Sequence, residues 1–470
     1  MRLTRFFARI VFNLRRANTF RSAVFYVHFS SAMLLLFSIP AFAIPAVAAG
    51  TSILDYHTLI KVEKGKLIQE LDIEIQVNSK REDWIAEISI RYGEHDKLEI
   101  LEAYITNPHG EVVRKLKKKD VISRSEVSAD TFFENNLLQE FELKWHEYPY
   151  KIRYKYRRTT DQYIYIARWY PILFKSVPVL HATLQVQVPD DLEVLINYSD
   201  SLHYKAAKEE GITLHTWQSS YHNELSGQPY EVNLLERLPF VGIVPKDFVY
   251  VAPGSFSSWA EFGDWQSRIL AGLDELPRSE QLVVDQLISG KNDEKEIIKT
   301  LYQHLQDHTR YVNVSIDEGG LVPYPSSYVC ANKYGDCKAL TNYMKALLSY
   351  AGITSYYTLI NAGENVQRID RAFPSQQFNH VILCVPLQQD TIWLENTSKY
   401  LPAGYIGTFT QNRYGLMVNG AESKLVKTPA LGLEDVLENS IYHLPSTKKG
   451  QECFRLVAAT RVPNSKNSNT

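Results

Sequence analysis

The chain has 470 residues, of which 45% are hydrophobic and 22% are charged, and its formal net charge at pH 7 is −2. A chain of this length is too long to fold around one ordinary hydrophobic core, so two or three domains are expected. The balanced charge excludes the strongly basic class of nucleic-acid-binding proteins and gives no electrostatic reason to expect a nucleic acid partner.

Residues 1–48 have the organisation of a secretory signal peptide. Arginines are frequent as far as Arg21, an apolar run covers residues 32–37, and small residues precede candidate cleavage points after Ala43 and Ala48. We therefore expect an exported protein of the periplasm or cell envelope. The alternative is an uncleaved membrane anchor, but the apolar part is short and interrupted by proline, which favours cleavage.

The cysteine content argues against a disulfide scaffold. The chain has only four cysteines, at positions 330, 337, 384 and 453, which is few for its length even in an oxidising compartment. Cys330 and Cys337 could form a disulfide. A redox function for these two thiols is the weakest interpretation, because their spacing is not that of a Cys-x-x-Cys motif.

Residues 51–240 alternate apolar and polar side chains with a period of two. The alternation is clearest over residues 71–77, 152–156 and 184–188, with turn signals between the runs. This pattern predicts half-buried antiparallel strands and therefore an N-terminal antiparallel β-sandwich domain. We find no group of residues with catalytic chemistry in it.

Residues 250–410 change to a helical period and then return to strands. A capping box of Ser258 and Glu261 begins one helix, and a second helix is expected over residues 293–307. Extended segments are expected over residues 310–315, 355–360, 378–385 and 391–396. This order predicts a second domain of the α+β class. Residues 411–470 are expected to be a C-terminal extension, which could be a truncated further β-domain.

The segment Lys333-Tyr-Gly-Asp-Cys-Lys-Ala-Leu340 places Cys337 at the beginning of a helix. Apolar residues follow at three- and four-residue intervals from Leu340 to Leu348, and Gly352 marks the expected end. Unpaired amides at a helix N-terminus favour negative charge, and so favour a reactive thiolate. The alternative for Cys337 is a small packed residue behind Asp336 as the N-cap.

Two later segments add a base and an acid. If the loop 386–389 joins Val385 and Asp390 as an opposed pair, His380 lies opposite Glu395 on the same face of a hairpin. A thiol that attacks a carbonyl needs such a base, and the base needs an acceptor on its other nitrogen. Cys337, His380 and Glu395 supply these parts, with Asn396 as the competitor for the third role.

These segments resemble the three core motifs of the transglutaminase-like superfamily of papain-related cysteine enzymes. The residues concerned are Lys333-Tyr-Gly-Asp-Cys-Lys338, Phe378-Asn-His-Val-Ile382 and Trp393-Leu-Glu-Asn-Thr397. The upstream β-region resembles domain of unknown function 3857, which commonly precedes this core. Together the resemblance covers residues 51–409.

The resemblance implies that Cys337 is the nucleophile, His380 the general base and Glu395 the orienting acid, where aspartate is usual. Tyr311 is the candidate for the side chain of the oxyanion hole. The implied reaction is acyl transfer from a peptide or glutamine amide through a thioester, with hydrolysis slightly favoured over transfer to an amine. Protein or peptide is the expected substrate.

No cofactor and no metal are implied by the sequence, and a membrane association is expected only through an uncleaved anchor. The alternative function is a non-enzymatic envelope protein, in which the β-domain binds a partner and the core is an inert scaffold. An intact nucleophile, base and acid argue against that alternative. Nothing in the sequence indicates the oligomeric state.

Overall fold

The structure is a computed structural model that describes residues 50–93, 95–125, 131–134, 137–222, 233–315, 320–431, 439–442 and 456–459. The signal peptide predicted for residues 1–48 and Cys453 lie outside these residues. Among the described helices, none is long and apolar enough to cross a membrane.

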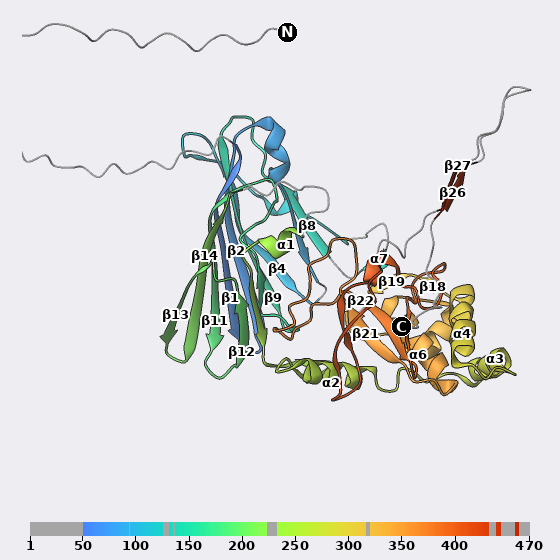
Figure 1. Cartoon of the computed structure of the whole chain (residues 1–470). Coiled ribbons are helices and arrows are strands. Elements are labelled where there is room, and N and C mark those ends of the chain that lie inside the picture. The colour runs from blue at the N-terminus through green and yellow to red at the C-terminus, as the bar shows by residue number, and fades with distance from the viewer. Residues whose placement is uncertain are drawn as a thin grey trace, which may run out of the picture. The chain divides into compact units, whose positions relative to one another are not determined.

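The largest sheet has eight strands in the order β13-β14-β11-β1-β2-β9-β4-β5 (Figure 1). Its strands are β1 (Ser52–Glu63), β2 (Lys66–Val77), β4 (Lys97–Thr106), β5 (Val112–Lys115), β9 (Tyr150–Thr160), β11 (Val179–Pro189), β13 (His203–Glu209) and β14 (Ile212–Tyr221). Between β1 and β2 a two-residue turn uses Lys64 and Gly65, both with positive φ, as a tight hairpin requires. The predicted period-two strands are therefore confirmed.

One pairing in this sheet differs from the expected antiparallel arrangement. Strands β1 and β11 run parallel, with Tyr56 beside Ala182 and Ile60 beside Val186. On one side of this pair, each of the strands β1, β2, β9, β4 and β5 runs antiparallel to the next. On the other side, β11, β14 and β13 also run antiparallel to their neighbours. The parallel pair joins these two groups. Alternation reveals which residues form strands, but it carries no information about the direction of a neighbour.

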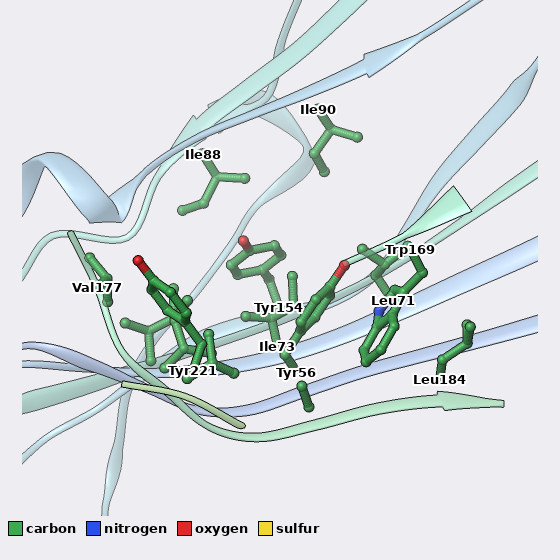
Figure 2. Close-up of a cluster of buried hydrophobic side chains, with 14 of the residues drawn as sticks. Tyr56, Leu71, Ile73, Ile88, Ile90, Tyr154, Trp169, Val177, Leu184 and Tyr221 are labelled. Carbon is green, nitrogen blue, oxygen red and sulfur yellow. The ribbon is translucent and has the colours of Figure 1, made fainter. Parts of the chain in front are cut away.

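Two three-stranded sheets cover the buried face of the large sheet. Their orders are β3-β8-β6 and β10-β15-β12, and their strands are β3 (Glu87–Tyr92), β6 (Ile122–Ser125), β8 (Leu137–Glu142), β10 (Ala167–Trp169), β12 (Val194–Tyr198) and β15 (Val241–Pro245). Figure 2 shows Ile88 and Ile90 of β3 facing Tyr154 and Ile73 of the large sheet. These sheets share one apolar core, which confirms the prediction of a large β-rich N-terminal region.

The following region contains an antiparallel five-stranded sheet of order β23-β22-β21-β24-β25. Its strands are β21 (Tyr356–Ile360), β22 (His380–Pro386), β23 (Thr391–Leu394), β24 (Tyr414–Met417) and β25 (Lys424–Lys427). The helices before it are α2 (Trp259–Leu270), α3 (Arg278–Ile288), α4 (Glu294–His308), α5 (Ser326–Asn332) and α6 (Cys337–Tyr350). Helices followed by an antiparallel sheet form the expected α+β arrangement.

The capping signals begin their helices where the sequence predicts. Ser258 accepts a hydrogen bond from the amide of Glu261 at the start of α2, and Asp293 caps α4. Helices α3 and α5 were not predicted. Each follows a proline, Pro277 and Pro325, and neither has a side-chain cap, so the usual start signal is missing.

The sheet places apolar residues on both faces. Leu383 and Val385 of β22 pack with the buried side of α6, whereas Ile382 and Cys384 belong to a separate cluster with Ile360 and Trp393. Because successive residues of a strand point to opposite faces, a strand buried on both sides is continuously apolar. This explains the uninterrupted run from Val381 to Val385.

The remaining described elements are short. They are η1 (Lys80–Ala86), η2 (Lys118–Asp120), β7 (Thr131–Glu134), α1 (Leu234–Arg237), β16 (Asp247–Tyr250), β17 (Ala252–Ser255), β18 (Arg310–Tyr311), β19 (Asn313–Ser315), β20 (Tyr334–Gly335), α7 (Gly407–Thr410), β26 (Asn439–Tyr442) and β27 (Leu456–Ala459). Strands β24 and β25 lie beyond residue 410, in the segment expected to be an extension, yet they complete the sheet that contains His380.

Candidate active site

Cys337 is the first residue of α6. The carboxylate of Asp336 accepts a hydrogen bond from the amide of Ala339 at 2.8 Å and so caps the helix. Gly335 precedes the cap, and a Cβ at this position would lie 2.9 Å from the Cβ of Ala339. Only glycine allows the chain to pass this close to the first turn of the helix.

Lys338 does not act as a free positive charge beside the thiol. Its Nζ lies 2.5 Å from Oδ2 of Asp336, and both side chains are largely buried. Burial by itself would lower the pKa of Lys338, but the Asp336 carboxylate and Cys337 outweigh it and raise that pKa. Asp336 therefore has two roles: it caps the helix and it neutralises the positive charge of Lys338.

His380 and Glu395 are hydrogen-bonded, but not as a directly opposed pair. The structure pairs Val385 with Ile392 and Leu383 with Leu394, so the predicted pairing of Val385 with Asp390 is wrong by two residues. A shift of two keeps every side chain on its predicted face. Nε2 of His380 lies 3.0 Å from Oε1 and 3.1 Å from Oε2 of Glu395.

The environment of His380 favours its charged form. The side chain is only 8% exposed, and burial by itself would lower its pKa. Attraction to the carboxylate of Glu395, together with hydrogen bonds to Cys337 and Glu395, reverses that effect and raises the pKa of His380 to about 10. Because Nε2 is held by Glu395, the other ring nitrogen, Nδ1, remains for Cys337. The ring of Phe409 packs edge-on against the imidazole, with centroids 5.4 Å apart.

Glu395 is a buried carboxylate held in place from three directions. Burial by itself would raise its pKa, but His380 and Thr397 lower it below its usual value. The hydroxyl of Thr397 donates to Oε1 at 2.6 Å, and the phenol of Tyr302 on α4 donates to the backbone oxygen of Glu395 at 2.7 Å. A carboxylate with these donors stays ionised and fixes the orientation of the imidazole.

Asn396, the sequence competitor for the third role, has a different partner. Its Nδ2 donates to the hydroxyl oxygen of Thr341 on α6 at 3.0 Å. Thr341 in turn donates to the backbone oxygen of Val381 at 3.3 Å. These hydrogen bonds connect helix α6, which begins with Cys337, to the β22–β23 hairpin, which carries His380. Asn396 therefore helps to hold Cys337 and His380 in place through Thr341.

One small pocket brings Cys337 and His380 together. Its volume is about 70 Å³. The residues that line it are Gly320, Leu321, Cys337, Lys338, Tyr357, Leu359, Gln376, Phe378, Asn379, His380 and Val381. Tyr311 is not among them; it lies on β18, where it pairs with Gly335, and its side chain is exposed.

Tyr357 is a residue of this pocket that the sequence did not point to. Its hydroxyl oxygen is buried and has no hydrogen-bond partner among the described residues. Burial, with smaller electrostatic contributions from Cys337 and Asp336, raises the pKa of Tyr357 well above its usual value, so the phenol keeps its proton. Leaving a buried donor without an acceptor costs free energy, so this hydroxyl is a candidate donor to a group bound in the pocket.

A second buried cluster of ionisable groups lies elsewhere, between α3, α4 and α6. Glu280 accepts hydrogen bonds from His304 at 3.0 Å and from Tyr343 at 2.5 Å, and Lys333 is 3.6 Å away. The hydrogen bond with His304, assisted by Tyr343 and Lys333, outweighs burial and lowers the pKa of Glu280 to about 2. The cluster joins three helices and lies outside the Cys337 pocket.

The cysteines described by the structure are free thiols. Cys330, Cys337 and Cys384 form no disulfide, so the pairing of Cys330 with Cys337 that the sequence left open is absent. Within the described ranges no group of three or more histidine, cysteine, aspartate or glutamate side chains is arranged to hold a metal ion.

Comparison with protein-family models matches residues 65–221 to a domain of unknown function with a solved structure, DUF3857. The match lies within the β-rich region and confirms that part of the sequence resemblance. No curated protein matches the chain.

Among solved structures, the chain is similar to that of a "putative protease" from Parabacteroides distasonis, with a TM-score of 0.63 and 12% identity. The alignment covers 86% of this chain and 79% of that chain, so the two share a fold that includes both the β-rich and the α+β regions.

Two peptidase structures match smaller parts of the chain. They are Legionella pneumophila aminopeptidase A in complex with aspartic acid (9% identity, 42% of this chain, 22% of that chain, TM-score 0.24) and the M1 zinc metallopeptidase of Deinococcus radiodurans (10% identity, 43% of this chain, 44% of that chain, TM-score 0.20). These TM-scores are too low to indicate a common fold.

Proposed function

We propose that this protein is a transglutaminase-like cysteine enzyme that transfers acyl groups from peptide or glutamine amides through a thioester. The observation that carries the proposal is the arrangement of one pocket. The thiol of Cys337 and the imidazole of His380 both line it, while Glu395 holds the far ring nitrogen of His380.

In the first half of the reaction, the proton of the Cys337 thiol passes to Nδ1 of His380. The raised pKa of His380 favours this imidazolium, and Glu395 compensates its charge. The thiolate sulfur then forms a bond to the carbonyl carbon of the substrate amide. His380 returns the proton to the amide nitrogen, the carbon–nitrogen bond breaks, and the amine leaves a thioester on Cys337.

The tetrahedral intermediate of this step carries an oxyanion that needs hydrogen-bond donors. We assign the backbone amide of Cys337 and the hydroxyl of Tyr357 to this role. The first amides of a helix have no partner within the helix, and the Tyr357 hydroxyl is a buried donor without a partner among the described residues. Donors of this kind, fixed before the reaction, stabilise developing charge without reorganisation.

The thioester is resolved either by water or by an amine. For hydrolysis, His380 takes a proton from water as the water oxygen bonds to the thioester carbon. The carbon–sulfur bond then breaks, His380 returns the proton to the sulfur of Cys337, and the carboxylic acid product leaves. We favour hydrolysis because the similar structure from Parabacteroides distasonis bears the name of a protease. Transfer to an amine differs only in the attacking nucleophile.

We also propose that the protein acts outside the cytoplasm, in the periplasm or cell envelope. This part of the proposal depends on the arginine-rich, apolar leader of residues 1–48. Detection of the mature N-terminus after residue 43 or 48 in a cell-envelope fraction is the expected result. A full-length N-terminus in the cytoplasm would contradict it.

The direct test is alkylation of the purified protein by iodoacetamide, located by mass spectrometry of its peptides. Cys337 should be alkylated faster than either of the other two described cysteines. Cys330 and Cys384 serve as internal controls, because burial raises the pKa of each thiol to about 11. His380→Gln should slow labelling of Cys337 by about 100-fold. An equal rate of Cys337 labelling in the native protein and in His380→Gln would contradict the proposal.

A second experiment separates the reaction types. The protein is incubated with a glutamine-containing peptide and a primary amine, and the products are weighed by mass spectrometry. A peptide cleavage or deamidation product indicates hydrolysis, and an amine adduct indicates transfer. A reactive Cys337 with no product from a broad peptide library would favour the non-enzymatic binding function instead.

A further inference from the structure

The pocket at Cys337 is too small to bind most of a peptide. At about 70 Å³ it has room for the reacting amide group, whereas ligand pockets usually measure roughly 300–1,000 Å³. The rest of a substrate must therefore bind on neighbouring surface. The connection between β21 and β22 contributes Gln376, Phe378 and Asn379 to the Cys337 pocket. The same connection also lines a second pocket of about 600 Å³.

We call this second cavity the basic pocket. Its charged lining residues are Arg368, Arg371, Arg413 and Lys427, and no carboxylate lines it. Within the described residues, none of the four side chains forms an ion pair with a carboxylate. Four cations around one cavity without a carboxylate among them are unusual in a chain whose net charge is −2. Like charges repel, so aspartate or glutamate side chains normally lie between clustered cations.

One of the four cations has a structural role. The guanidinium of Arg413 donates to the backbone oxygens of Asn361 at 2.8 Å and of Thr408 at 3.3 Å. It also donates to the backbone oxygen of Gly363. These bonds hold the start of the connection against α7 and fix one wall of the basic pocket.

Two of the other cations are positioned by aromatic and strand contacts. Arg371 lies over the ring of Tyr414, with its Cζ 4.6 Å from the centroid, and donates to the Tyr414 hydroxyl at 3.1 Å. Lys427 is directly opposed to Tyr414 in the antiparallel pair of β24 and β25, so both side chains project to the same face. One aromatic ring therefore brings two cations together.

Two carboxylates, one on the connection and one in contact with it, already have hydrogen-bond partners. Asp370 accepts hydrogen bonds from the side chain of Asn197 at 2.7 Å and from the amide of Ala372 at 2.9 Å. Glu236 accepts from the backbone amide of Arg368 at 2.6 Å. Because no carboxylate is among the lining residues of the basic pocket, its positive charge is available to an external anion.

The basic pocket adjoins the Cys337 pocket through two contacts. Asn379, which lines the Cys337 pocket, exchanges hydrogen bonds of 2.7 and 3.0 Å with the backbone of Ala362. Phe409 packs against His380 and accepts a hydrogen bond from the amide of Gly363. A single connection, residues 361–379, thus forms walls of both pockets.

We propose that the basic pocket binds the carboxylates of an acidic peptide segment that flanks the amide attacked by Cys337. The peptide assignment rests on the proposed function, whereas the preference for an anion does not. Arg368, Arg371 and Lys427 would pair with carboxylates, and the side-chain amides of Asn365 and Asn412, which also line the pocket, suit a peptide backbone. The face of Tyr414 is covered by Arg371, which disfavours stacking of a nucleotide base.

The test measures binding without catalysis. Full-length protein carrying Cys337→Ala is titrated with two fluorescently labelled peptides that differ only in having aspartate or serine at four flanking positions, and anisotropy is recorded. The aspartate peptide should bind at least about tenfold more tightly, and the difference should shrink with added salt. Arg371→Gln with Lys427→Gln should remove about tenfold of that affinity and leave the serine peptide unaffected.

The matched control removes two exposed cations elsewhere, Lys205→Gln with Lys299→Gln, and should leave both affinities unchanged. Circular dichroism checks folding, and Lys427→Glu serves as a single charge reversal if the double variant is unstable. Equal affinity for the two peptides, or no effect of the double variant, would overturn the proposal. Displacement of the aspartate peptide by inorganic phosphate at equal concentration would overturn the assignment to a peptide.

The two proposals fail in different ways. If the aspartate peptide binds as expected but Cys337 in the native protein proves unreactive, the basic pocket stands and the catalytic function is wrong. If Cys337 cleaves aspartate and serine peptides at the same rate and the basic-pocket variants change nothing, the catalytic function stands and the proposed anion site is wrong.

Discussion

Nε2 of His380 lies within 3.1 Å of both carboxylate oxygens of Glu395, although the register of the hairpin makes the two residues diagonal neighbours. Continuing the pairs Leu383–Leu394 and Cys384–Trp393 would place Glu395 beside Ile382. Diagonal residues on one face are roughly 7–8 Å apart, compared with about 5 Å for opposed residues. The additional methylene of glutamate relative to aspartate spans this greater distance.

Replacing the acid should therefore separate the effects of length and charge. Glu395→Gln keeps the length but removes the charge that raises the pKa of His380, so that pKa should fall from about 10 toward its usual value. His380 would then lose its proton at lower pH, and alkylation of Cys337 should slow at least about tenfold. Carbon-13 NMR of the histidine ring and the pH profile of alkylation measure both effects.

The controls for this prediction are two conservative variants. Glu395→Asp keeps the charge but is too short for the diagonal, so it should lower the pKa of His380 less than glutamine does. Thr397→Val removes only a neutral donor to the carboxylate, which lies 2.6 Å away, and should have the smallest effect. A histidine titration in Glu395→Gln that equals that of the native protein would show that another group holds the charge.

Tyr357→Phe should reduce activity without reducing stability. The hydroxyl has no hydrogen-bond partner among the described residues, so its removal takes away an unsatisfied buried group and should leave the free energy of unfolding unchanged or slightly higher. If the hydroxyl binds the oxyanion, kcat should fall roughly 100- to 1,000-fold. Steady-state kinetics and urea unfolding on the same preparation provide the two measurements.

Tyr343→Phe is the matched control for Tyr357. Its hydroxyl donates to Glu280 at 2.5 Å and lies outside the Cys337 pocket, so this variant should lose stability instead of chemistry. If Tyr357→Phe retains full kcat, the oxyanion donor is another group, and the exposed Tyr311 on β18 is next to be tested.

These contrasts also explain what the sequence could and could not predict. Alternation identified the strands, and capping residues identified the starts of α2, α4 and α6, because both signals are local. The two-residue error in register did not harm the pairing of His380 with Glu395, because parity alone decides which face a residue occupies.

The features that escaped prediction depend on contacts between distant segments. Tyr357 lies in an apolar strand, and nothing in its neighbours indicates that its hydroxyl reaches the pocket of Cys337. The parallel pairing of β1 with β11 joins two separately antiparallel groups of strands, and no local pattern encodes direction. The basic pocket likewise combines residues 361–371 with residues 411–427, which only the sheet brings together.

Asn396→Ala should weaken the attachment of the cysteine helix to the hairpin. The side chain donates to Thr341 at 3.0 Å, and both residues are buried, so the loss should be about 1–2 kcal/mol of unfolding free energy. Thr341→Val removes the other partner, and the double variant should cost clearly less than the sum of the two single variants. The pH profile of Cys337 alkylation should keep its shape, because Asn396 does not contact His380.

The Glu280 cluster should make stability depend on pH in a predictable direction. The pKa of Glu280 is lowered from 4.5 to about 2, so its ionised form stabilises the folded state above pH 4.5. That contribution is lost as the pH falls from about 4.5 toward 2, because protonation then removes the acceptor for His304 and Lys333. Glu280→Gln should therefore cost about 2 kcal/mol at pH 7 and progressively less below pH 4.5.

Urea unfolding of the native protein and Glu280→Gln at pH 7, 5, 4 and 3 measures this difference. The exposed neighbour Glu275 provides the control, and Glu275→Gln should show no comparable convergence with pH. A constant difference between the native protein and Glu280→Gln across this range would mean that the variant acts through packing and not through charge. Because the cluster joins α3, α4 and α6, a loss of stability that follows its protonation would also identify it as the part of the cysteine-helix scaffold most sensitive to acid.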